Sequence, residues 1–256
     1  MNNLTIATWN VNGLRAGLRN GFLDWLNTTS PDVVCLQEVK AYESQVDVDF
    51  SAYGYSAVWN SAEKAGYSGV LTLSKNLPKE TRVGLDEVRF NDEGRVIRHQ
   101  YDSFYLYNIY FPNGQRGHDR VDYKLDFYSS LLEECLKLIA AGKNVIITGD
   151  FNTAHQEMDL ANPKENQNTS GFLPEERAAV TEFLDAGFVD VFRKLYPDLV
   201  KYTWWTYRFQ ARKRNIGWRL DYYLVNSNFV GAVRDVVVED QVTGSDHCPV
   251  LLKLEC

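Results

Sequence analysis

The chain has 256 residues, of which 45% are hydrophobic and 24% charged, and its formal net charge is −7. This composition is ordinary for a soluble globular protein, and no apolar run has membrane-spanning length, which argues against a membrane partner. The acidic balance argues at first against a nucleic-acid partner, because proteins that bind phosphates usually carry a basic surface.

The cysteines and the start of the chain indicate the cellular setting. The four cysteines are scattered without the spacing of a metal knuckle or redox motif, and the first residues lead into a strand pattern instead of a signal peptide. We therefore expect a cytoplasmic protein with reduced cysteines. No Pro/Gly/Ser-rich linker divides the sequence, so residues 1–256 are expected to form a single domain. No surface pattern specifies an oligomer, and a monomer is the expectation.

Short strands and turns dominate the first 110 residues. A short helix near the start places Phe22, Trp25 and Leu26 on one face. Residues 82–88 and 95–101 are expected to pair antiparallel, because a turn-like segment separates them. Strands are predicted over residues 4–9, 33–36, 55–60, 70–73, 82–88, 95–101 and 104–110.

Helices and strands alternate in the rest of the chain. The longest predicted helix covers residues 119–141 and ends at Gly142, and another begins at Pro174 and stops at Gly187. Between them, residues 145–147 form an apolar run typical of a buried parallel strand. Further strands are predicted over residues 220–225, 234–238 and 249–254. The pattern predicts one α/β domain with mixed sheets inside and helices outside.

Polar side chains recur where the predicted strands end. Asp150 and Asn152 follow the apolar run at 145–147, and residues two apart in an extended segment point the same way. In isolation, such a pair is typical of an ordinary turn. Similar positions at other predicted strand ends are held by Asn10, Asn12, Glu38, Tyr110, Asn113, Asp221, Asp246 and His247. Because open α/β sheets bind ligands at the carboxyl ends of their strands, the whole set predicts one site.

This set suggests metal-assisted hydrolysis. It consists of carboxylates, amides and one histidine, the groups used for acid–base catalysis and for binding hard cations. The sequence has no nucleophile elbow, phosphate-binding loop or dinucleotide-binding loop, and the spacing of its four histidines does not suggest zinc. Oxygen ligands favour Mg²⁺ or Mn²⁺ as the cofactor. A metal ion, carboxylates and a histidine suit attack of water on a phosphodiester.

The positive charge is concentrated in one segment. Residues 199–220 contain no acidic residue but six Lys or Arg and six aromatic side chains. A solvated basic loop would explain the charges but not the rings. Phosphate-binding cations beside rings that stack on bases, or wedge between them, would explain both. This segment therefore favours a nucleic-acid partner in spite of the net charge.

Several motifs together resemble one family. They occur in the order Trp9-Asn-Val-Asn-Gly-Leu-Arg15, Leu36-Gln-Glu-Val-Lys40, Tyr110-Phe-Pro-Asn113, Gly149-Asp-Phe-Asn152, Gly217-Trp-Arg-Leu-Asp-Tyr222 and Ser245-Asp-His247. With them the chain resembles the exonuclease III family of apurinic/apyrimidinic (AP) endonucleases, within the DNase I-like phosphoesterases. The resemblance implies a four-layer α/β sandwich of two packed mixed sheets flanked by helices.

The resemblance also implies an activity. A nuclease of this kind uses Mg²⁺ to hydrolyse the phosphodiester 5′ to abasic sites in double-stranded DNA, with 3′–5′ exonuclease and 3′-phosphodiesterase activity. Trp204 is bulkier than the phenylalanine of some relatives, which leaves incision at damaged bases such as deoxyuridine open. The number of metal ions and the identity of the general base are open as well.

The same resemblance implies roles for the polar set. Glu38 matches the principal metal ligand, and Asn10, Asn12 and Asp246 lie near the ion. The catalytic positions are Asp150 for the attacking water, Asn152 and Tyr110 as donors, and His247 as a phosphate-binding group oriented by Asp221.

Seven further residues match positions that contact DNA. A pocket for a flipped, baseless sugar is expected, and the remaining positions enter the grooves or follow the phosphate path. The pocket residues are Trp204, Trp218 and Leu220, the groove residues Arg116 and Arg208, and the phosphate-path residues Asn113 and Lys40.

Two other functions fit parts of the sequence. A phosphoesterase with the same catalytic set could act on inositol phosphates, a phospholipid headgroup or an RNA 3′ tail, but residues 202–221 suit duplex DNA better. A non-catalytic DNA-binding module on the same fold is the second alternative. The complete catalytic set argues against it.

Overall fold

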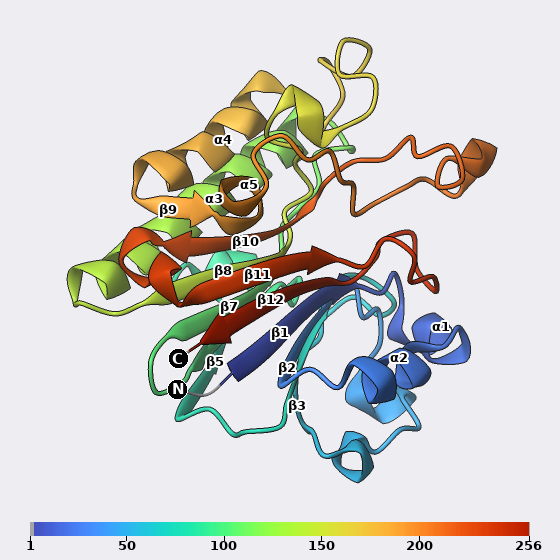
Figure 1. Cartoon of the computed structure of the whole chain (residues 1–256), viewed down its shortest axis with the longest axis vertical. Helices are drawn as coiled ribbons and strands as arrows, with labels where there is room; N and C mark the ends of the chain where they lie inside the picture. Colours follow the sequence, from blue (N-terminus) through green and yellow to red (C-terminus); the bar gives the residue numbers. More distant parts are fainter. Residues whose placement is uncertain (1–2, 256) are drawn as a thin grey trace.

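The computed structural model describes residues 3–255, and within them two six-stranded β-sheets pack face to face (Figure 1). The strands are β1 (Asn3–Asn10), β2 (Val33–Gln37), β3 (Ser56–Asn60), β4 (Val70–Ser74), β5 (Glu80–Val83), β6 (Val96–Gln100), β7 (Tyr105–Tyr110), β8 (Val145–Asp150), β9 (Phe188–Asp190), β10 (Asp221–Asn226), β11 (Val233–Val238) and β12 (Val250–Glu255). The first sheet has the order β11-β12-β1-β2-β4-β3, and the second has the order β5-β6-β7-β8-β10-β9.

Helices cover the two outer faces, which confirms the four-layer α/β sandwich (Figure 1). Residues two apart in a strand share a face of the sheet. Apolar residues occupy both faces of these strands, so each sheet buries apolar side chains on both sides. Trp9 of β1 packs on Phe22 beside the first sheet, whereas Ile147 of β8 belongs to the apolar cluster that covers the second sheet and includes Phe127. The helices are α1 (Leu14–Arg19), α2 (Phe22–Thr29), α3 (His118–Ala140), α4 (Pro174–Asp185) and α5 (Val191–Leu195).

The layer between the sheets changes from apolar to polar along the strands. The inward-facing residues of β1 are Ile6, Thr8 and Asn10 in sequence order, and those of β8 run from isoleucine through threonine to Asp150. All of these side chains are buried. The strand alternation that builds the core therefore delivers polar groups to one end of it.

Hydrogen bonds connect the two sheets inside this polar region. Gln37 of β2 donates from Nε2 to Oδ1 of Asn108 on β7 at 2.8 Å, and Asn108 donates from Nδ2 to the carbonyl of Leu71 on β4 at 3.0 Å. Gln37 and Asn108 are both fully buried. Because hydrogen bonds are directional and apolar contacts are not, these bonds specify how the sheets sit on each other.

The apolar run at 145–147 lies in β8, as expected, parallel to β7 and antiparallel to β10. Gly149 is required there: its φ is +136°, and a Cβ atom would lie 1.8 Å from the carbonyl oxygen of Ile109 on β7. Any side chain at this position would push β8 away from its neighbour, directly before Asp150.

The predicted strand over residues 82–88 was too long. The strand is β5 (Glu80–Val83), which pairs antiparallel with β6, and the chain leaves the sheet at Gly84, where φ is +78°. The Asn91 side chain then bonds both the amide and the carbonyl of Leu85, at 2.8 and 3.1 Å, which fixes a loop instead of a strand. The predictions also omitted α1, β9 and α5. No helix within residues 3–255 has the length and apolarity to cross a bilayer.

Candidate active site

Three neighbouring strands of the second sheet bring their polar ends together. Tyr110 at the end of β7 is paired with Asp150 at the end of the parallel strand β8. Asp150 is in turn paired with Asp221, the first residue of the antiparallel strand β10. The first sheet ends at the same place, since Asn10 bonds directly to Asp150.

The Asp150 carboxylate is held by hydrogen bonds on both of its oxygens. Asn10 donates from Nδ2 to Oδ2 of Asp150 at 2.8 Å and to Oε1 of Glu38 at 2.9 Å, so one amide joins carboxylates of the two sheets. The backbone amide of Asn152 donates to Oδ1 of Asp150 at 2.8 Å. These bonds fix the orientation of a carboxylate that is 1% exposed.

His247 lies between two carboxylates. Its Nδ1 is 2.9 Å from Oδ2 of Asp221, and its Nε2 is 3.7 Å from Oδ2 of Asp150. Burial disfavours the charged imidazole, but the charges of Asp221 and Asp150 outweigh it and raise the pKa of His247 to about 10. Burial raises the pKa of Asp150 to about 7, against the opposing charge of His247. The two carboxylates thus favour the protonated imidazole, which can donate hydrogen bonds, whereas burial favours the neutral form of the Asp150 carboxyl group.

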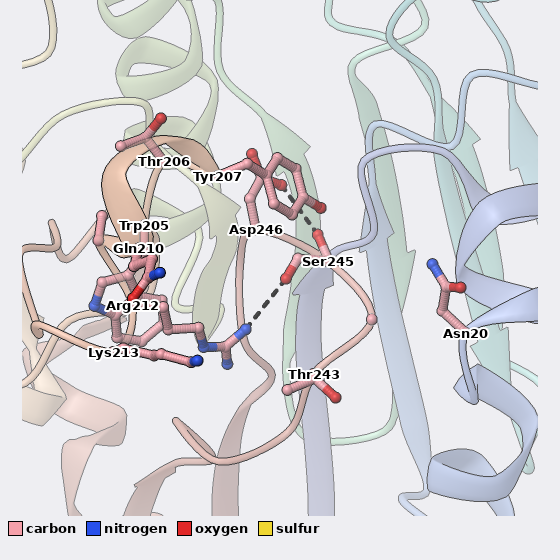
Figure 2. Close-up of a pocket in the computed structure, with 12 residues that line it drawn as sticks. Asn20, Trp205, Thr206, Tyr207, Gln210, Arg212, Lys213, Thr243, Ser245 and Asp246 are labelled. Atoms are coloured by element: carbon pink, nitrogen blue, oxygen red, sulfur yellow. Dashed lines mark hydrogen bonds between the residues drawn. The ribbon is translucent and has the colours of Figure 1, made fainter.

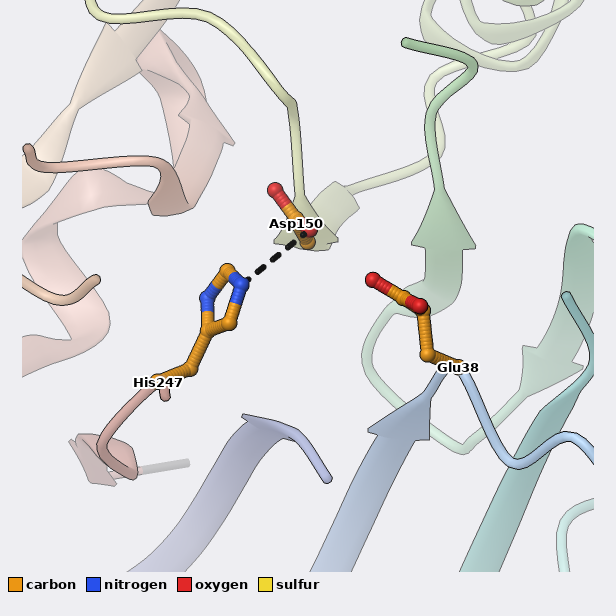
Figure 3. A group of neighbouring side chains, drawn as sticks. All are labelled: Glu38, Asp150 and His247. Atoms are coloured by element: carbon orange, nitrogen blue, oxygen red, sulfur yellow. Dashed lines mark ion pairs between the residues drawn. The ribbon is translucent and has the colours of Figure 1, made fainter. Parts of the chain in front are cut away.

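One group of residues has the geometry of a metal site. Glu38, Asp150 and His247 each place one ligand atom within 4.8 Å of the others (Figure 3). Two carboxylates surrounded by asparagine side chains match the oxygen-rich coordination that Mg²⁺ and Mn²⁺ prefer. The residues present therefore fit a divalent cation.

The remaining predicted metal-binding residues lie around this group. Lys40 Nζ is 2.7 Å from Oε2 of Glu38 and donates to Oδ1 of Asn12 at 2.6 Å. Burial would raise the pKa of Glu38, but the Lys40 charge and the Asn10 hydrogen bond lower it, so Glu38 is ionised. Asp246 is connected through Asn12, whose Nδ2 donates to it at 3.0 Å. Lys40, which was predicted beside the phosphate path, thus contacts the oxygens of Glu38 and Asn12.

Several site residues have unusual backbone conformations. Asn12, Glu38, Lys40 and Asn152 have φ values of 46°, 49°, 52° and 51°, in the left-handed region that side chains other than glycine rarely adopt. This conformation costs about 1–2 kcal/mol each at Glu38 and Lys40, whereas asparagine adopts it more readily, and strain of this kind concentrates at functional sites. These turns direct the side chains back over the strand ends.

A cavity of about 550 Å³ opens beside these groups. Trp204 and Trp218 contribute two rings in a T-shaped pair, 6.3 Å apart at an interplanar angle of 86°, and Leu220 lies next to them. Trp204 also donates from Nε1 to Oδ2 of Asp246 at 3.1 Å, which ties the wall of the cavity to the metal-binding set. Predicted residues that line this cavity are Asn12, Glu38, Tyr110, Asn113, Asn152, Trp204, Trp218, Leu220, Asp246 and His247.

The two predicted groove residues lie outside this cavity. Arg208 is exposed on the loop that extends beyond the strand ends, next to Phe209, which is 81% exposed and has a φ of 56°. Arg116 lies over the ring of Tyr67, with 5.7 Å between its guanidinium carbon and the ring centroid. Both are separated from the catalytic carboxylates, as residues that contact DNA away from the cleaved bond would be.

A second cavity of about 550 Å³ lies against Asp246, between residues 205–213 and 243–246 (Figure 2). Arg212 crosses it, donating to the Ser245 carbonyl at 3.2 Å and lying over the Trp205 ring at 4.6 Å. The guanidinium thus supports the base of the exposed loop. This cavity does not contain the carboxylate–histidine group.

Sequence reasoning missed two buried cations beside the site. Lys124 and Glu176 form an ion pair of 2.7 Å with both side chains fully buried, and Lys124 also donates to the carbonyl of Asn152 at 2.8 Å. Arg95 is 1% exposed and donates to the carbonyl of Tyr110 at 2.9 Å. Isolated Lys and Arg in helix and strand patterns are usually solvent-exposed, so the sequence carried no signal for either.

Known proteins share this architecture. The Endonuclease/Exonuclease/phosphatase family matches residues 7–247. An exodeoxyribonuclease of Bacillus subtilis is 45% identical over 97% of this chain and 98% of its own length, and the DNA repair nuclease APEX1 of Danio rerio is 42% identical over 98% and 82%.

Solved structures agree. An AP endonuclease from Archaeoglobus fulgidus superimposes with a TM-score of 0.90 at 30% identity, covering 99% of this chain and 100% of that one. A 3′ phosphatase from Neisseria bound to a product DNA hairpin gives a TM-score of 0.92 at 27% identity, with the same coverage. The chain therefore belongs to the endonuclease/exonuclease/phosphatase family of metal-dependent phosphodiesterases, in its exonuclease III-type branch of DNA repair nucleases.

Proposed function

We propose that the protein hydrolyses the phosphodiester 5′ to abasic sites in double-stranded DNA, with Mg²⁺ or Mn²⁺ as cofactor. One observation carries the proposal: Asp150, held by Asn10 and beside the His247–Asp221 pair, contacts His247 and Asn152, which line a cavity whose wall includes Trp204 and Trp218. The carboxylates and the histidine suit phosphodiester hydrolysis, and the two tryptophan rings suit a substrate from which a base is missing.

Residues at the strand ends would perform different parts of the reaction. Asp150 is oriented by two hydrogen bonds and can align the attacking water and accept its proton. His247, protonated and held at Nδ1 by Asp221, can donate from Nε2 to a phosphate oxygen. Tyr110 and Asn152 line the same cavity and add donors for the charge that develops on the phosphate.

Glu38 would hold the divalent cation, with Asn10, Asn12 and Asp246 around it. When bound, the ion supplies positive charge that offsets the scissile phosphate and the leaving 3′ oxygen. The Lys40 ammonium contacts Oε2 of Glu38 at 2.7 Å, so it would compete with a cation for the charge of this carboxylate. This competition predicts that metal affinity is sensitive to the charge at residue 40.

The cavity favours a sugar without a base. Trp204, Trp218 and Leu220 offer apolar surface against a flipped deoxyribose, and they offer few groups that could pair with a base edge. Asn113 lines the same cavity, where it could contact the phosphate path. Since Trp204 is bonded to Asp246, it holds its position instead of yielding to a larger substrate, so deoxyuridine should be a poorer substrate than an abasic site.

The same site can act at a 3′ end. A blocked or unpaired 3′ nucleotide presents the same phosphodiester, so 3′–5′ exonuclease and 3′-phosphodiesterase activity belong to the proposal. The exodeoxyribonuclease and 3′ phosphatase among the similar proteins support it. We propose a monomer acting in the cytoplasm, where Cys35, Cys135 and Cys248, which are free and buried here, would stay reduced.

A cleavage assay tests the proposal. Duplexes carrying an abasic analogue, a uridine or no lesion are incubated with Mg²⁺, with Mn²⁺ and with EDTA. We expect a single incision 5′ to the abasic analogue with either metal ion, weaker incision at uridine, and none with EDTA. Binding of the abasic duplex without cleavage would instead support a DNA-binding module, and faster hydrolysis of inositol phosphates would indicate a different substrate.

A further inference from the structure

Arg95 contacts Tyr110 in three ways. It immediately precedes β6, and its carbonyl accepts a hydrogen bond from the Tyr110 amide at 2.9 Å. Its Nη1 donates to the Tyr110 carbonyl at 2.9 Å. Its guanidinium carbon also lies 4.6 Å from the centroid of the Tyr110 ring. Backbone and ring of one residue are thus fixed by a single side chain.

The guanidinium is held by groups on its other edges. Nε lies 2.6 Å from Oε2 of Glu93, and Nη2 donates to the Tyr67 hydroxyl at 3.1 Å. Arg120 contacts the same two groups, at 2.6 Å from Glu93 and 3.2 Å from the Tyr67 hydroxyl. Two arginines therefore share one carboxylate, and the buried one is the one that reaches Tyr110.

Burying Arg95 costs hydration free energy, and a purely structural role would not require that cost. Arg95 is 1% exposed and Glu93 is 23% exposed in the side chain, so the pair gives up hydration on the arginine side. Buried ion pairs are often no more stabilising than well-packed apolar side chains of similar volume. The cost makes sense where a planar, multidentate cation must hold a particular partner in one orientation.

We infer that Arg95 is a positioning residue for Tyr110: it fixes the tyrosine so that its hydroxyl points at the phosphate-binding end of the cavity. The inference rests on the proposed function, in which Tyr110 donates to the phosphate. Tyr110 lines the cavity together with Glu38 and His247, so it borders the space in which the phosphate would lie.

The same cluster reaches the outer surface. The ring of Tyr67 lies beneath Arg116, a groove-contacting residue in the proposed function, and its hydroxyl accepts from Arg95. Arg116, which would contact DNA outside the cavity, is thus joined through Tyr67 to Arg95, which holds Tyr110. Replacing Arg95 should therefore lower kcat more than it weakens DNA binding, because Arg95 contacts Tyr110 and is not exposed to solvent.

A double-mutant cycle tests the inference on an abasic duplex. Arg95→Met should lower kcat about tenfold with KM within about threefold, since small misplacements of catalytic groups are costly. In a Tyr110→Phe background, which has no hydroxyl to orient, Arg95→Met should cost less than about twofold. Arg95→Lys, which keeps the charge but not the fork, should recover part of kcat. Tyr67→Phe, which removes one partner of Arg95, should give a smaller loss of the same kind.

Arg120→Met is the matched control, because Arg120 shares Glu93 and Tyr67 but has no hydrogen bond to Tyr110. Its effect should be equal in the wild-type and Tyr110→Phe backgrounds. If Arg95→Met and Tyr67→Phe each lower kcat by the same factor in the wild-type and the Tyr110→Phe backgrounds, Arg95 acts on stability alone and the inference fails. If Arg95→Met does not fold, the Tyr67→Phe and Arg95→Lys cycles decide. Absence of cleavage by the wild-type protein would overturn the proposed function itself, which separates the two failures.

Discussion

The polar floor beneath the cavity and the exposed loop outside it, called the rim below, are built on different principles. The floor consists of side chains at strand ends, such as Asp150 and His247, which are buried and hydrogen-bonded on more than one side. The rim consists of loop residues such as Arg208 and Phe209, which are exposed and make few contacts. Rigid elements hold the groups that must be placed accurately, whereas loops carry the groups that meet a large substrate. The two regions should therefore fail in different ways when altered.

The floor should show the largest effects. We expect Asp150→Ala or His247→Ala to lower kcat on an abasic duplex by at least about 10², because each removes a group that moves or donates a proton. The KM and the affinity for the duplex should change little. Single-turnover kinetics and a binding titration measure the two quantities separately.

Asp102→Ala is the matched control for the floor, since it removes a carboxylate that is 88% exposed and paired with Lys79. Its kcat should equal that of the wild type. Near wild-type turnover by purified, folded Asp150→Ala protein would show that the floor does not carry the chemistry.

Trp204 joins the two regions, and its replacement should have an intermediate effect. Trp204→Phe removes the indole N–H that bonds Asp246 and leaves a smaller ring against Trp218. We expect the preference for an abasic site over uridine, expressed as the ratio of kcat/KM values, to fall by about tenfold. Trp205→Phe also removes an indole hydrogen bond, to Asn215, but outside the substrate cavity, so it should leave that ratio unchanged. An equal loss in both variants would assign the effect to the loop instead of the pocket.

The rim should show the smallest effect, visible mainly as salt dependence. Arg208→Ala should lower the slope of log K against log salt by about one, as expected for one lost phosphate contact, with kcat unchanged. Arg234→Ala, at an exposed pair with Glu255, is the corresponding control and should not change the slope. A large loss of kcat in Arg208→Ala would mean that the rim takes part in the chemistry.

The sequence predicted the fold well where alternation was regular. The strand at 4–9 follows from alternation and the one at 145–147 from a short continuous apolar run, and the polar residues after them identified the floor. The strand over residues 82–88 was predicted wrongly, because the turn depends on Gly84 and the Asn91 side chain, neither of which disturbs the periodicity. Local pattern does not reveal which polar side chain will bond a distant backbone.

The site was harder to predict in detail. Positions matched by resemblance, such as Glu38 and Asp150, do converge, but their partners could not be derived. Lys40 lies on Glu38 because both residues have left-handed backbone conformations that turn the side chain inward. Arg95 is buried although its residue type and place in the strand pattern suggest exposure. The first arrangement depends on local backbone conformation, and the second on contacts of Arg95 with Tyr67 and Tyr110, which are distant in the sequence.

The hydrogen bonds between Gln37 and Asn108 have a further consequence. Glu38 directly follows Gln37 on the first sheet, and Tyr110 lies two residues after Asn108 on the second. The bond therefore sets the offset between the two halves of the reaction centre, one residue away from the metal-binding carboxylate. A substitution at Gln37 or Asn108, which are buried and out of reach of any substrate, would lower activity by letting one sheet shift relative to the other.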